Sequence, residues 1–401
     1  MGQGCPQEYL LQETKGTRSE DLPPVPSRRA VHISTVHPAL DARIFYREAL
    51  ALRDHGYDVT VFGVCKEDAR VEGVSVRAIG GSHGRFDRMA MSGYRGLRAV
   101  LAERGDVYHF HDPELMPAAL LAKWLWRKRV VYDVHEDVAL VMLKDWIPRW
   151  LRPVVARLLG RLDALNARCV DGLVVTTRRH YDHYKPLARR VTVFHNFPAP
   201  AFLWQRDRCW TPPEQRLNEV IHLGTVSQAR LKVLVDIAQG FLEKFPEWQW
   251  TFLGMHPPMV QWFEANVQGP IRQRLHGLGK VPHEEVAAHL CRARIGVNYH
   301  RLDSRQLQMV IPLKVFEYMA CGLGAISTRV PALVESLSDC GAVTFTEESP
   351  EQYLADLAAL ATRADLAAVG HEARRYADER LDCDREVQSL LALYDAILAG
   401  R

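Results

Sequence analysis

The sequence predicts an α/β protein made of two doubly wound, Rossmann-like domains that face each other across a cleft. In both halves of the chain, short apolar segments alternate with amphipathic segments of helical period, the pattern of parallel strands joined by helical crossovers. A break in composition separates the halves near residues 201–216. The length of 401 residues also exceeds what one hydrophobic core usually supports.

The first domain is predicted over residues 29–200. Residues 1–28 precede it and are polar and proline-containing, which predicts a flexible leader. Strands are expected at 30–34, 57–63, 107–111, 129–133, 172–176 and 191–194. Helices are expected at 41–56, 115–127 and 146–168.

The second domain is predicted over residues 217–383, after an interdomain linker at 201–216. Its strands are expected at 220–224, 248–254, 295–298, 324–327 and 342–345, and its helices at 231–244, 284–293, 312–321 and 351–361. An apolar helix at 387–398, within the last segment 384–401, follows the completed second sheet. We expect it to cross back and brace the first domain.

Composition excludes several classes of protein. The net charge of +3 gives no indication of nucleic-acid binding. No apolar run approaches the roughly 18 residues of a membrane span, and no hydrophobic signal region opens the chain, so a cytoplasmic location is expected. Eight scattered cysteines without C-x-x-C, and 17 histidines without His-x-x-x-His, predict no structural or catalytic zinc site.

Polar side chains follow the first strands of the first domain, where a doubly wound sheet binds its ligands. The loop after the first strand carries His37, Asp41 and Arg43 and lacks the G-x-G-x-x-G of a dinucleotide site. The alternative for this loop is an N-cap, Asp41, with an incidental arginine. The other candidates lie on, or directly after, the expected strands at 107–111 and 129–133: His109, His111 and Asp112, then Asp133, His135 and Glu136. For the two strand histidines, ordinary buried and satisfied side chains are the alternative.

In the second domain, the segment Pro312–Gly322 predicts a short helix with Lys314 and Glu317 on one face. Its N-terminus offers free N–H groups to an anion, and Lys314 adds a charge. A core helix with a local Lys–Glu pair is the alternative. A second candidate is the turn at Gly224, where backbone N–H groups and two cations, Arg230 and Lys232, could hold a diphosphate; a solvated basic first turn is its alternative.

Taken together, five segments resemble the family-4 retaining glycosyltransferases, which have the GT-B fold. They are His-Pro-x-x-Asp-x-Arg-Ile-Phe at 37–45, His-Phe-His-Asp-Pro-Glu-Leu at 109–115, Tyr-Asp-Val-His-Glu-Asp at 132–137, Pro-His-Glu-Glu-Val at 282–286 and Pro-x-Lys-x-Phe-Glu-Tyr-Met-Ala-x-Gly-Leu at 312–323. The resemblance implies transfer of a sugar from a nucleotide diphosphosugar, a UDP-sugar being favoured, with retention at the anomeric carbon and without a bound metal or other cofactor.

The resemblance also assigns parts to individual residues. Glu317 would bind the ribose hydroxyls, Arg230 and Lys314 would neutralise the diphosphate, and His111 would lie by the donor sugar. The catalytic residues implied are His111, Asp112, Arg230 and Lys314. Nucleotide-sugar contacts are implied for Gly224, Thr225, Arg230, Lys232, Lys314 and Glu317. The acceptor or cleft side would hold His37, Asp41, Arg43, His109, His135 and Glu136.

Three positions depart from the family pattern. Met309 stands where many members carry a glutamate that contacts the donor sugar. Either a neighbour supplies that contact, with Asp303, Gln306 and Gln308 as candidates, or donor recognition differs. Thr225 replaces a frequent arginine, and Gly324 a usual proline.

Residues 144–190 hold 11 Lys or Arg against four Asp and no Glu, together with an apolar stripe from Trp146 to Leu162. A basic amphipathic helix of this kind can lie on an anionic membrane, which predicts a peripheral contact with its inner face; a core-facing stripe is the alternative. The acceptor would be a hydroxyl of a saccharide, a lipid-linked saccharide or a small molecule. Two other classes stay open: a degenerate GT-B nucleotide-sugar-binding protein and a GT-B nucleotide-sugar epimerase.

Overall fold

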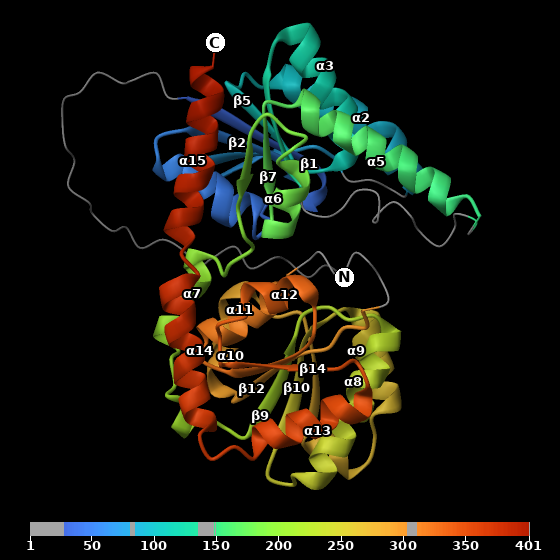
Figure 1. Cartoon of the computed structure of the whole chain (residues 1–401), viewed down its shortest axis with the longest axis vertical. Helices are drawn as coiled ribbons and strands as arrows, with labels where there is room; N and C mark the ends of the chain where they lie inside the picture. The colour runs from blue at the N-terminus through green and yellow to red at the C-terminus, as the bar shows by residue number, and fades with distance from the viewer. Residues whose placement is uncertain (1–27, 81–84, 135–147, 149, 303–310, 401) are drawn as a thin grey trace, which may run out of the picture.

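The computed structural model describes residues 28–80, 85–134, 148, 150–302 and 311–400. Two α/β domains lie one above the other, each with a central sheet between helices (Figure 1). The predicted fold class of two doubly wound, Rossmann-like domains is confirmed.

The first domain contains an eight-stranded sheet of order β3-β4-β2-β1-β5-β6-β7-β8, parallel except for the β3–β4 pair. Its strands are β1 (Arg29–Pro38), β2 (Asp58–Val64), β3 (Ala69–Val71), β4 (Val74–Ala78), β5 (Val107–Phe110), β6 (Arg129–Val134), β7 (Gly172–Val175) and β8 (Val191–Val193). Its helices are η1 (Ile44–Ala49), α1 (Leu50–Asp54), α2 (Arg85–Ala102), η2 (Pro113–Leu115), α3 (Met116–Trp126), α5 (Arg152–Cys169) and α6 (Arg178–Tyr184).

The second domain contains a six-stranded, all-parallel sheet of order β11-β10-β9-β12-β13-β14. Its strands are β9 (Glu219–Leu223), β10 (Gln249–Met255), β11 (Leu275–Gly279), β12 (Ile295–Asn298), β13 (Gly324–Thr328) and β14 (Val343–Thr346). The helices around it are α7 (Pro200–Arg208), η3 (Pro213–Gln215), α8 (Gln228–Lys244), α9 (Pro257–Asn266), η4 (Pro270–Gln273), α10 (His283–Arg292), α11 (Leu313–Ala320), α12 (Pro331–Ser336), α13 (Pro350–Ala361) and α14 (Leu366–Arg380).

The carboxyl ends of the two sheets face each other. Helix α6 follows directly on β7, and α12 follows directly on β13. Arg179 Nε of α6 lies 2.6 Å from Glu335 Oε2 of α12, so an ion pair joins the two strand-end regions (Figure 1). Ligand-binding loops of doubly wound sheets lie at these ends, so the strand-end loops of both domains border the same space.

The last helix, α15 (Cys383–Ala399), packs on the first domain, although it follows the second in sequence (Figure 1). Leu390, Leu393 and Tyr394 join the core that contains Ala30 of β1 and Val107 of β5. Residues 201–216, expected as a linker, contain most of α7, whose Phe202 is buried in the core of the second domain. They are therefore part of that domain's packing as well as a connection.

The first helix differs from the prediction of one helix over 41–56. It is a π-helix, η1, continued by the short α-helix α1. The wider turn is defined by i→i−5 bonds, from Tyr46 N to Asp41 O at 3.3 Å and from Glu48 N to Arg43 O at 3.0 Å. Such turns are rare and frequently occur at functional sites. This one carries Glu48 into the interior, where the carboxylate is fully buried.

Candidate active site

In the second domain, the start of α11 lies against the end of β9. Lys314 Nζ is 3.4 Å from His222 Nε2, and a Cβ added to Gly224 would lie 3.9 Å from the same ammonium. The turn at Gly224 has φ +92°, a left-handed conformation that favours glycine. The structure therefore brings the turn and the helix start together, as the two candidate segments require.

Tyr318 holds this arrangement in place. Its hydroxyl accepts a hydrogen bond from Leu223 N at 2.8 Å and donates one to Val297 O at 3.2 Å. Its ring packs on β12 at Gly296, where an added Cβ would come within 2.3 Å of the ring. Helix α11 is thereby fixed against β9 and β12, so the positions of Lys314 and Glu317 are set by buried contacts.

Arg230 completes the group of cations. Its Nη2 donates to Thr225 O at 2.7 Å, and its Nη1 lies 3.0 Å from His300 Nδ1. Ser227 caps α8 by accepting from Arg230 N. Lys232, two residues further along α8, is exposed. Residues two apart on a helix do not share a face, so the structure places Lys232 away from this group, contrary to its predicted part in phosphate binding.

The electrostatics of this group suit an anion. Burial and the charge of Arg230 lower the pKa of Lys314 to about 7. Burial raises the pKa of Glu317 to about 7, against the influence of Lys314. Burial and the neighbouring cations also lower the pKa of His222, and that of His300 to about 3, which keeps both imidazoles neutral. An incoming diphosphate would restore full charge to Lys314, because its own charge favours the ammonium form.

In the first domain, Asp112 anchors the last part of β1, which extends to Pro38 and so includes His37, expected in the loop. The carboxylate accepts from Thr35 N at 2.6 Å and from Ser34 Oγ at 3.0 Å. His37, the least buried member of this cluster, lies 3.8 Å from Asp112 and 3.6 Å from Asp41. Burial opposes ionisation of Asp41, yet its contact with His37 and the amides of η1 outweigh burial and lower its pKa. The predicted N-cap contact is present, since Asp41 Oδ1 accepts from Arg43 N at 2.8 Å.

Arg43 and His111 belong to a buried network below this loop. Arg43 donates to both oxygens of Asp133, at 2.8 and 2.9 Å. Asp133 Oδ2 lies 3.3 Å from His111 Nδ1, and His111 Nε2 lies 3.0 Å from His32 Nδ1. Both ring nitrogens of His111 thus face protein groups, and the side chain is buried. The donor-sugar contact expected for His111 is not available to its nitrogens in this arrangement.

His109 does not line a cleft, contrary to the prediction. It is fully buried, its ring stacks on that of His111 at a centroid distance of 4.6 Å, and its Nδ1 lies 2.9 Å from Tyr394 Oη of α15. The reason is that α15 covers the face of β5 on which both histidines lie. The alternative of a satisfied buried histidine holds for His109. Burial and neighbouring imidazoles lower its pKa.

Several predicted positions lie outside the described residues. They are His135 and Glu136 in the first domain, and Asp303, Gln306, Gln308 and Met309 in the second.

Sequence reasoning missed His32, Glu48, His222 and His300 as members of these clusters. A signal existed for Glu48, which lies three residues after Phe45 and four before Leu52, on the apolar face of a predicted helix. A carboxylate at such a position indicates a specific buried partner.

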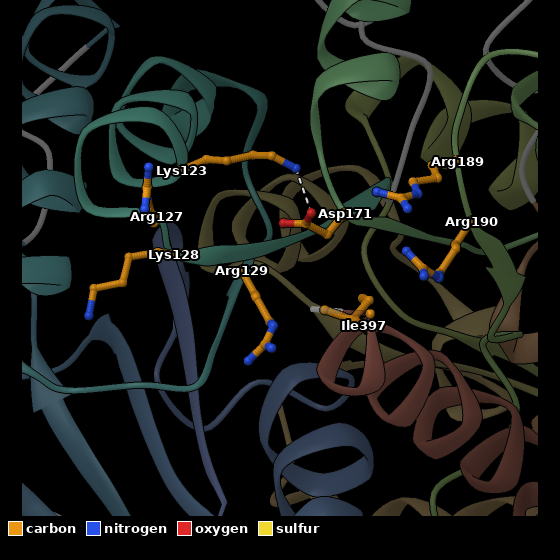
Figure 2. A pocket seen from close by; sticks show the side chains of 9 residues that line it. Lys123, Arg127, Lys128, Arg129, Asp171, Arg189, Arg190 and Ile397 are labelled. Carbon is orange, nitrogen blue, oxygen red and sulfur yellow. Dashed lines mark hydrogen bonds and ion pairs between the residues drawn. The ribbon is translucent and has the colours of Figure 1, made fainter.

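A cavity of about 620 Å³ opens elsewhere on the first domain (Figure 2). It lies at the amino ends of β6, β7 and β8, the edge of the sheet opposite to the candidate site. Its only carboxylate among the lining residues, Asp171, pairs with Lys123 at 2.5 Å. The remaining charged lining residues are Arg127, Lys128, Arg129, Arg189 and Arg190. The position excludes this cavity from the candidate active site.

Comparison with known sequences gives two family models that match consecutive parts of the chain. The first, described as Glycosyl transferase 4-like domain, matches residues 42–197, and the second, described as Glycosyl transferase-like, matches residues 237–392. No curated protein matches the chain.

Solved structures share the fold along nearly the whole chain. Sucrose-phosphate synthase from Thermosynechococcus elongatus is 13% identical, with a TM-score of 0.67 over 93% of this chain and 100% of that one. WaaG, a glycosyltransferase involved in lipopolysaccharide biosynthesis, is 16% identical, with a TM-score of 0.64 over 93% and 100%. HepE from Anabaena, in complex with UDP, is 11% identical, with a TM-score of 0.60 over 92% and 100%.

Proposed function

Since the chain belongs to the glycosyltransferases of the GT-B fold, with matches to family-4-type domains, we propose that it is a retaining hexosyltransferase. The donor is a nucleotide diphosphosugar, with UDP-sugars favoured, and the acceptor is a hydroxyl group. The observation that carries the proposal is the group formed by Lys314, Arg230 and the Gly224 turn, with Glu317 one helical turn further along α11.

The proposed donor site follows from these positions. The diphosphate lies at the N-terminus of α11, where free N–H groups, Lys314 and Arg230 face it. The ribose hydroxyls donate to Glu317. As the sugar–phosphate bond breaks, negative charge develops on the leaving diphosphate, and preorganised cations and dipoles stabilise it. No side-chain nucleophile is needed if the acceptor attacks from the face that the leaving group occupies, and no metal is needed at the diphosphate.

The preference for UDP is supported by the complex of Anabaena HepE with UDP, a structure of the same fold. Arabidopsis starch synthase IV, another protein of this fold, binds ADP and acarbose. The fold therefore serves more than one nucleotide, so the test includes both.

Glu317→Ala is expected to abolish the thermal stabilisation that a nucleotide donor gives to the wild type. Ligands that bind only the folded state raise the melting temperature by mass action, and the variant lacks the ribose contact. UDP-glucose, UDP-galactose, UDP-N-acetylglucosamine, ADP-glucose and GDP-mannose would be compared by differential scanning fluorimetry. Glu351→Ala, which removes an exposed glutamate from the start of α13, is the control and should retain the shift. An equal shift in Glu317→Ala contradicts the assignment.

Two other activities would have different products. A degenerate nucleotide-sugar-binding protein would show the thermal shift without hydrolysis or transfer of the donor. An epimerase would convert the donor with no acceptor present. Incubation of the stabilising donor with and without a mixture of acceptors, followed by mass spectrometry and NMR of the sugar, separates these activities from transfer. The anomeric coupling constant of the product reports retention or inversion.

Helix α5 supports a peripheral membrane contact as part of the proposed function. It turns Asp163 and Ala167 toward the domain, where Asp163 accepts from Tyr184 Oη at 2.6 Å. Its apolar side chains remain exposed: Val154, Leu158, Leu162 and Leu165, preceded by Trp150, which is 76% exposed. Leu151, Val155 and Leu159 of the same stripe are half-buried. Arginines accompany them at 152, 157, 161 and 168, the combination that binds anionic lipid surfaces.

The contact would be peripheral. Among the described residues, none of the helices combines the length and the hydrophobicity that crossing a bilayer requires.

Leu158→Ser/Leu162→Ser is expected to weaken binding to phosphatidylglycerol-containing vesicles about ten-fold or more, because two partly inserted leucines lose their transfer free energy. Co-sedimentation with vesicles would measure the partition. The control, Trp204→Ser/Leu217→Ser, removes two exposed apolar side chains that are not on α5 and should bind like the wild type. Equal loss in both variants, or none in the first, contradicts a contact through α5.

A further inference from the structure

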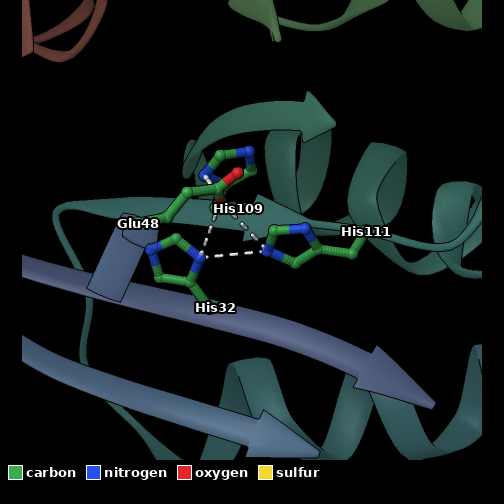
Figure 3. A group of neighbouring side chains, drawn as sticks. All are labelled: His32, Glu48, His109 and His111. Carbon is green, nitrogen blue, oxygen red and sulfur yellow. Dashed lines mark hydrogen bonds and ion pairs between the residues drawn. The ribbon is translucent and has the colours of Figure 1, made fainter. Parts of the chain in front are cut away.

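Four buried side chains of the first domain converge on one point (Figure 3). His32 comes from β1, Glu48 from η1, and His109 and His111 from β5 and the residue after it. One ligand-type atom of each lies within 4.8 Å of those of the other three. Imidazole nitrogens and a carboxylate oxygen are ordinary ligands of zinc and related ions.

The distances from Glu48 to the three imidazoles are those between ligands of one ion, whereas the 3.0 Å between His32 Nδ1 and His111 Nε2 is a hydrogen-bond distance that must lengthen when an ion binds. Glu48 Oε2 lies 3.7 Å from His32 Nδ1 and 3.9 Å from His109 Nδ1 and His111 Nε2. These are too long for hydrogen bonds. Ligands at about 2.0–2.1 Å from a tetrahedral zinc ion lie about 3.3 Å apart. Glu48 Oε1 lies 3.0 Å from Arg43 Nε in an ion pair, and Oε2, which faces the three imidazoles, accepts no hydrogen bond from a described residue, which is costly for a buried carboxylate oxygen.

The π-helix is what brings Glu48 to this point. The i→i−5 bond from Glu48 N to Arg43 O, 3.0 Å long, widens the turn and directs the glutamate toward β1 and β5. A π-turn costs stability relative to a regular α-helix, and such turns accumulate at functional sites. The result of this π-turn is that a buried carboxylate lies opposite three histidines.

Side chains around the four proposed ligands also fit a metal centre. Asp133 Oδ2 lies 3.3 Å from His111 Nδ1, and Arg43 holds that carboxylate from the other side. Metal-ligating histidines commonly have such a carboxylate on the second nitrogen, which fixes the tautomer and leaves the first nitrogen for the ion. Tyr394 Oη, 2.9 Å from His109 Nδ1, competes for the same nitrogen and must yield it when an ion binds there.

Charge gives a further argument. Two fully buried carboxylates, Glu48 and Asp133, face one guanidinium, that of Arg43. A divalent cation between Glu48 and the histidines would add positive charge beside both carboxylates.

We propose that His32, Glu48, His109 and His111 bind a divalent first-row transition ion, Zn²⁺ by its ligand preference, which ties η1 to β1 and β5. The expectation of no zinc site rested on spacing along the chain, and that criterion does not detect ligands supplied by three separate elements. The ion lies in the first domain and is separate from the proposed diphosphate site on α11. The proposal therefore stands or falls independently of the transferase activity.

The test is the metal content of the full chain, purified without a polyhistidine tag from zinc-supplemented medium. Plasma mass spectrometry is expected to find about one equivalent per chain in the wild type and in His180→Asn, a control that changes a buried histidine outside the cluster. Glu48→Gln and His32→Asn are expected to lose at least about ten-fold in affinity for the ion. Chelation should lower the melting temperature of the wild type by about 5 °C, and added Zn²⁺ should restore it.

Co²⁺ identifies the ligands. When Co²⁺ is added to wild-type protein from which the metal has been removed by a chelator, the absorption spectrum should show the intense visible bands of a four-coordinate site and no thiolate charge-transfer band. In Glu48→Gln these visible bands should be absent. The proposal is overturned if the wild type holds no stoichiometric metal and neither Zn²⁺ nor Co²⁺ changes its melting temperature or spectrum. It is also overturned if Glu48→Gln retains a full equivalent. Should the variants fail to fold, the wild-type measurements alone decide between an ion and a metal-free histidine network.

Discussion

Lys314→Ala is expected to lower kcat/KM for sugar transfer about a thousand-fold, the typical effect of removing a group that stabilises developing charge. Lys314 is the cation at the start of α11, next to the Gly224 turn, and Arg230 cannot move into its place because Thr225 O and His300 hold it. Transfer assays with the stabilising donor measure the loss. Lys232→Ala, which removes an exposed cation from the neighbouring helix, should stay within about two-fold of the wild type.

The pH dependence of kcat/KM in the same assay tests whether Lys314 is the group that titrates. Because burial lowers the pKa of Lys314 to about 7, the free enzyme loses this charge as the pH rises through 7. Values of kcat/KM should then fall on the alkaline side, since they report the free enzyme. Lys314→Arg keeps its charge at every accessible pH, so its lower activity should lack this decline. An identical alkaline decline in Lys314→Arg would assign the titration to another group.

Arg43→Met is expected to reduce the free energy of unfolding by about 3–5 kcal/mol, the cost of breaking a buried ion pair by removing one partner. The substitution leaves Asp133 and Glu48 buried without their guanidinium and also removes the bonds from Arg43 to Phe194 O and Asn196 Oδ1. Urea denaturation of the full chain, followed by circular dichroism, measures the change.

Two further variants distinguish the cost of leaving buried carboxylates without a partner from the cost of removing an arginine in general. Arg329→Met removes one partner of an exposed ion pair with Glu347 and should cost at most about 1 kcal/mol. Arg43→Met/Asp133→Asn should recover part of the loss, because fewer buried charges then lack a partner. A cost for Arg43→Met no larger than that of Arg329→Met would contradict this account of the network.

The fold could be predicted because the pattern of apolar residues is clearest in strands that are buried on both faces. The central strands β5, β9 and β12 come within one residue of their expected bounds, and β1 begins within one residue of its expected start but extends four residues further, to Pro38. Three strands were missed, β3, β4 and β11. They are edge or near-edge strands, and one of them, Leu275–Gly279, carries two glycines, which weaken the strand signal.

The relative positions of candidate residues could be predicted where a whole motif lies on one element. Pro312–Gly322 is such a case, since Lys314 and Glu317 lie one helical turn apart and the proline and glycine mark the ends. Prediction failed where the contact depends on packing between elements. The partners of His109 and His111 come from β1, η1 and α15, and a π-turn is not visible in an apolar period of 3.6 residues. For the same reason, the sequence did not predict that Glu48 belongs to this buried cluster.

Helix α15 makes the order of synthesis matter for folding. The core around Ala30 and Val107 is completed by Leu390, Leu393 and Tyr394, which the ribosome adds after the entire second domain. Gly172 of β7 lies so close to Ile397 that a Cβ there would come within 2.8 Å of it. The first domain therefore reaches its final packing after the second, although its sequence comes first, and the newly made chain must hold its first sheet with one hydrophobic face uncovered until α15 has been synthesised.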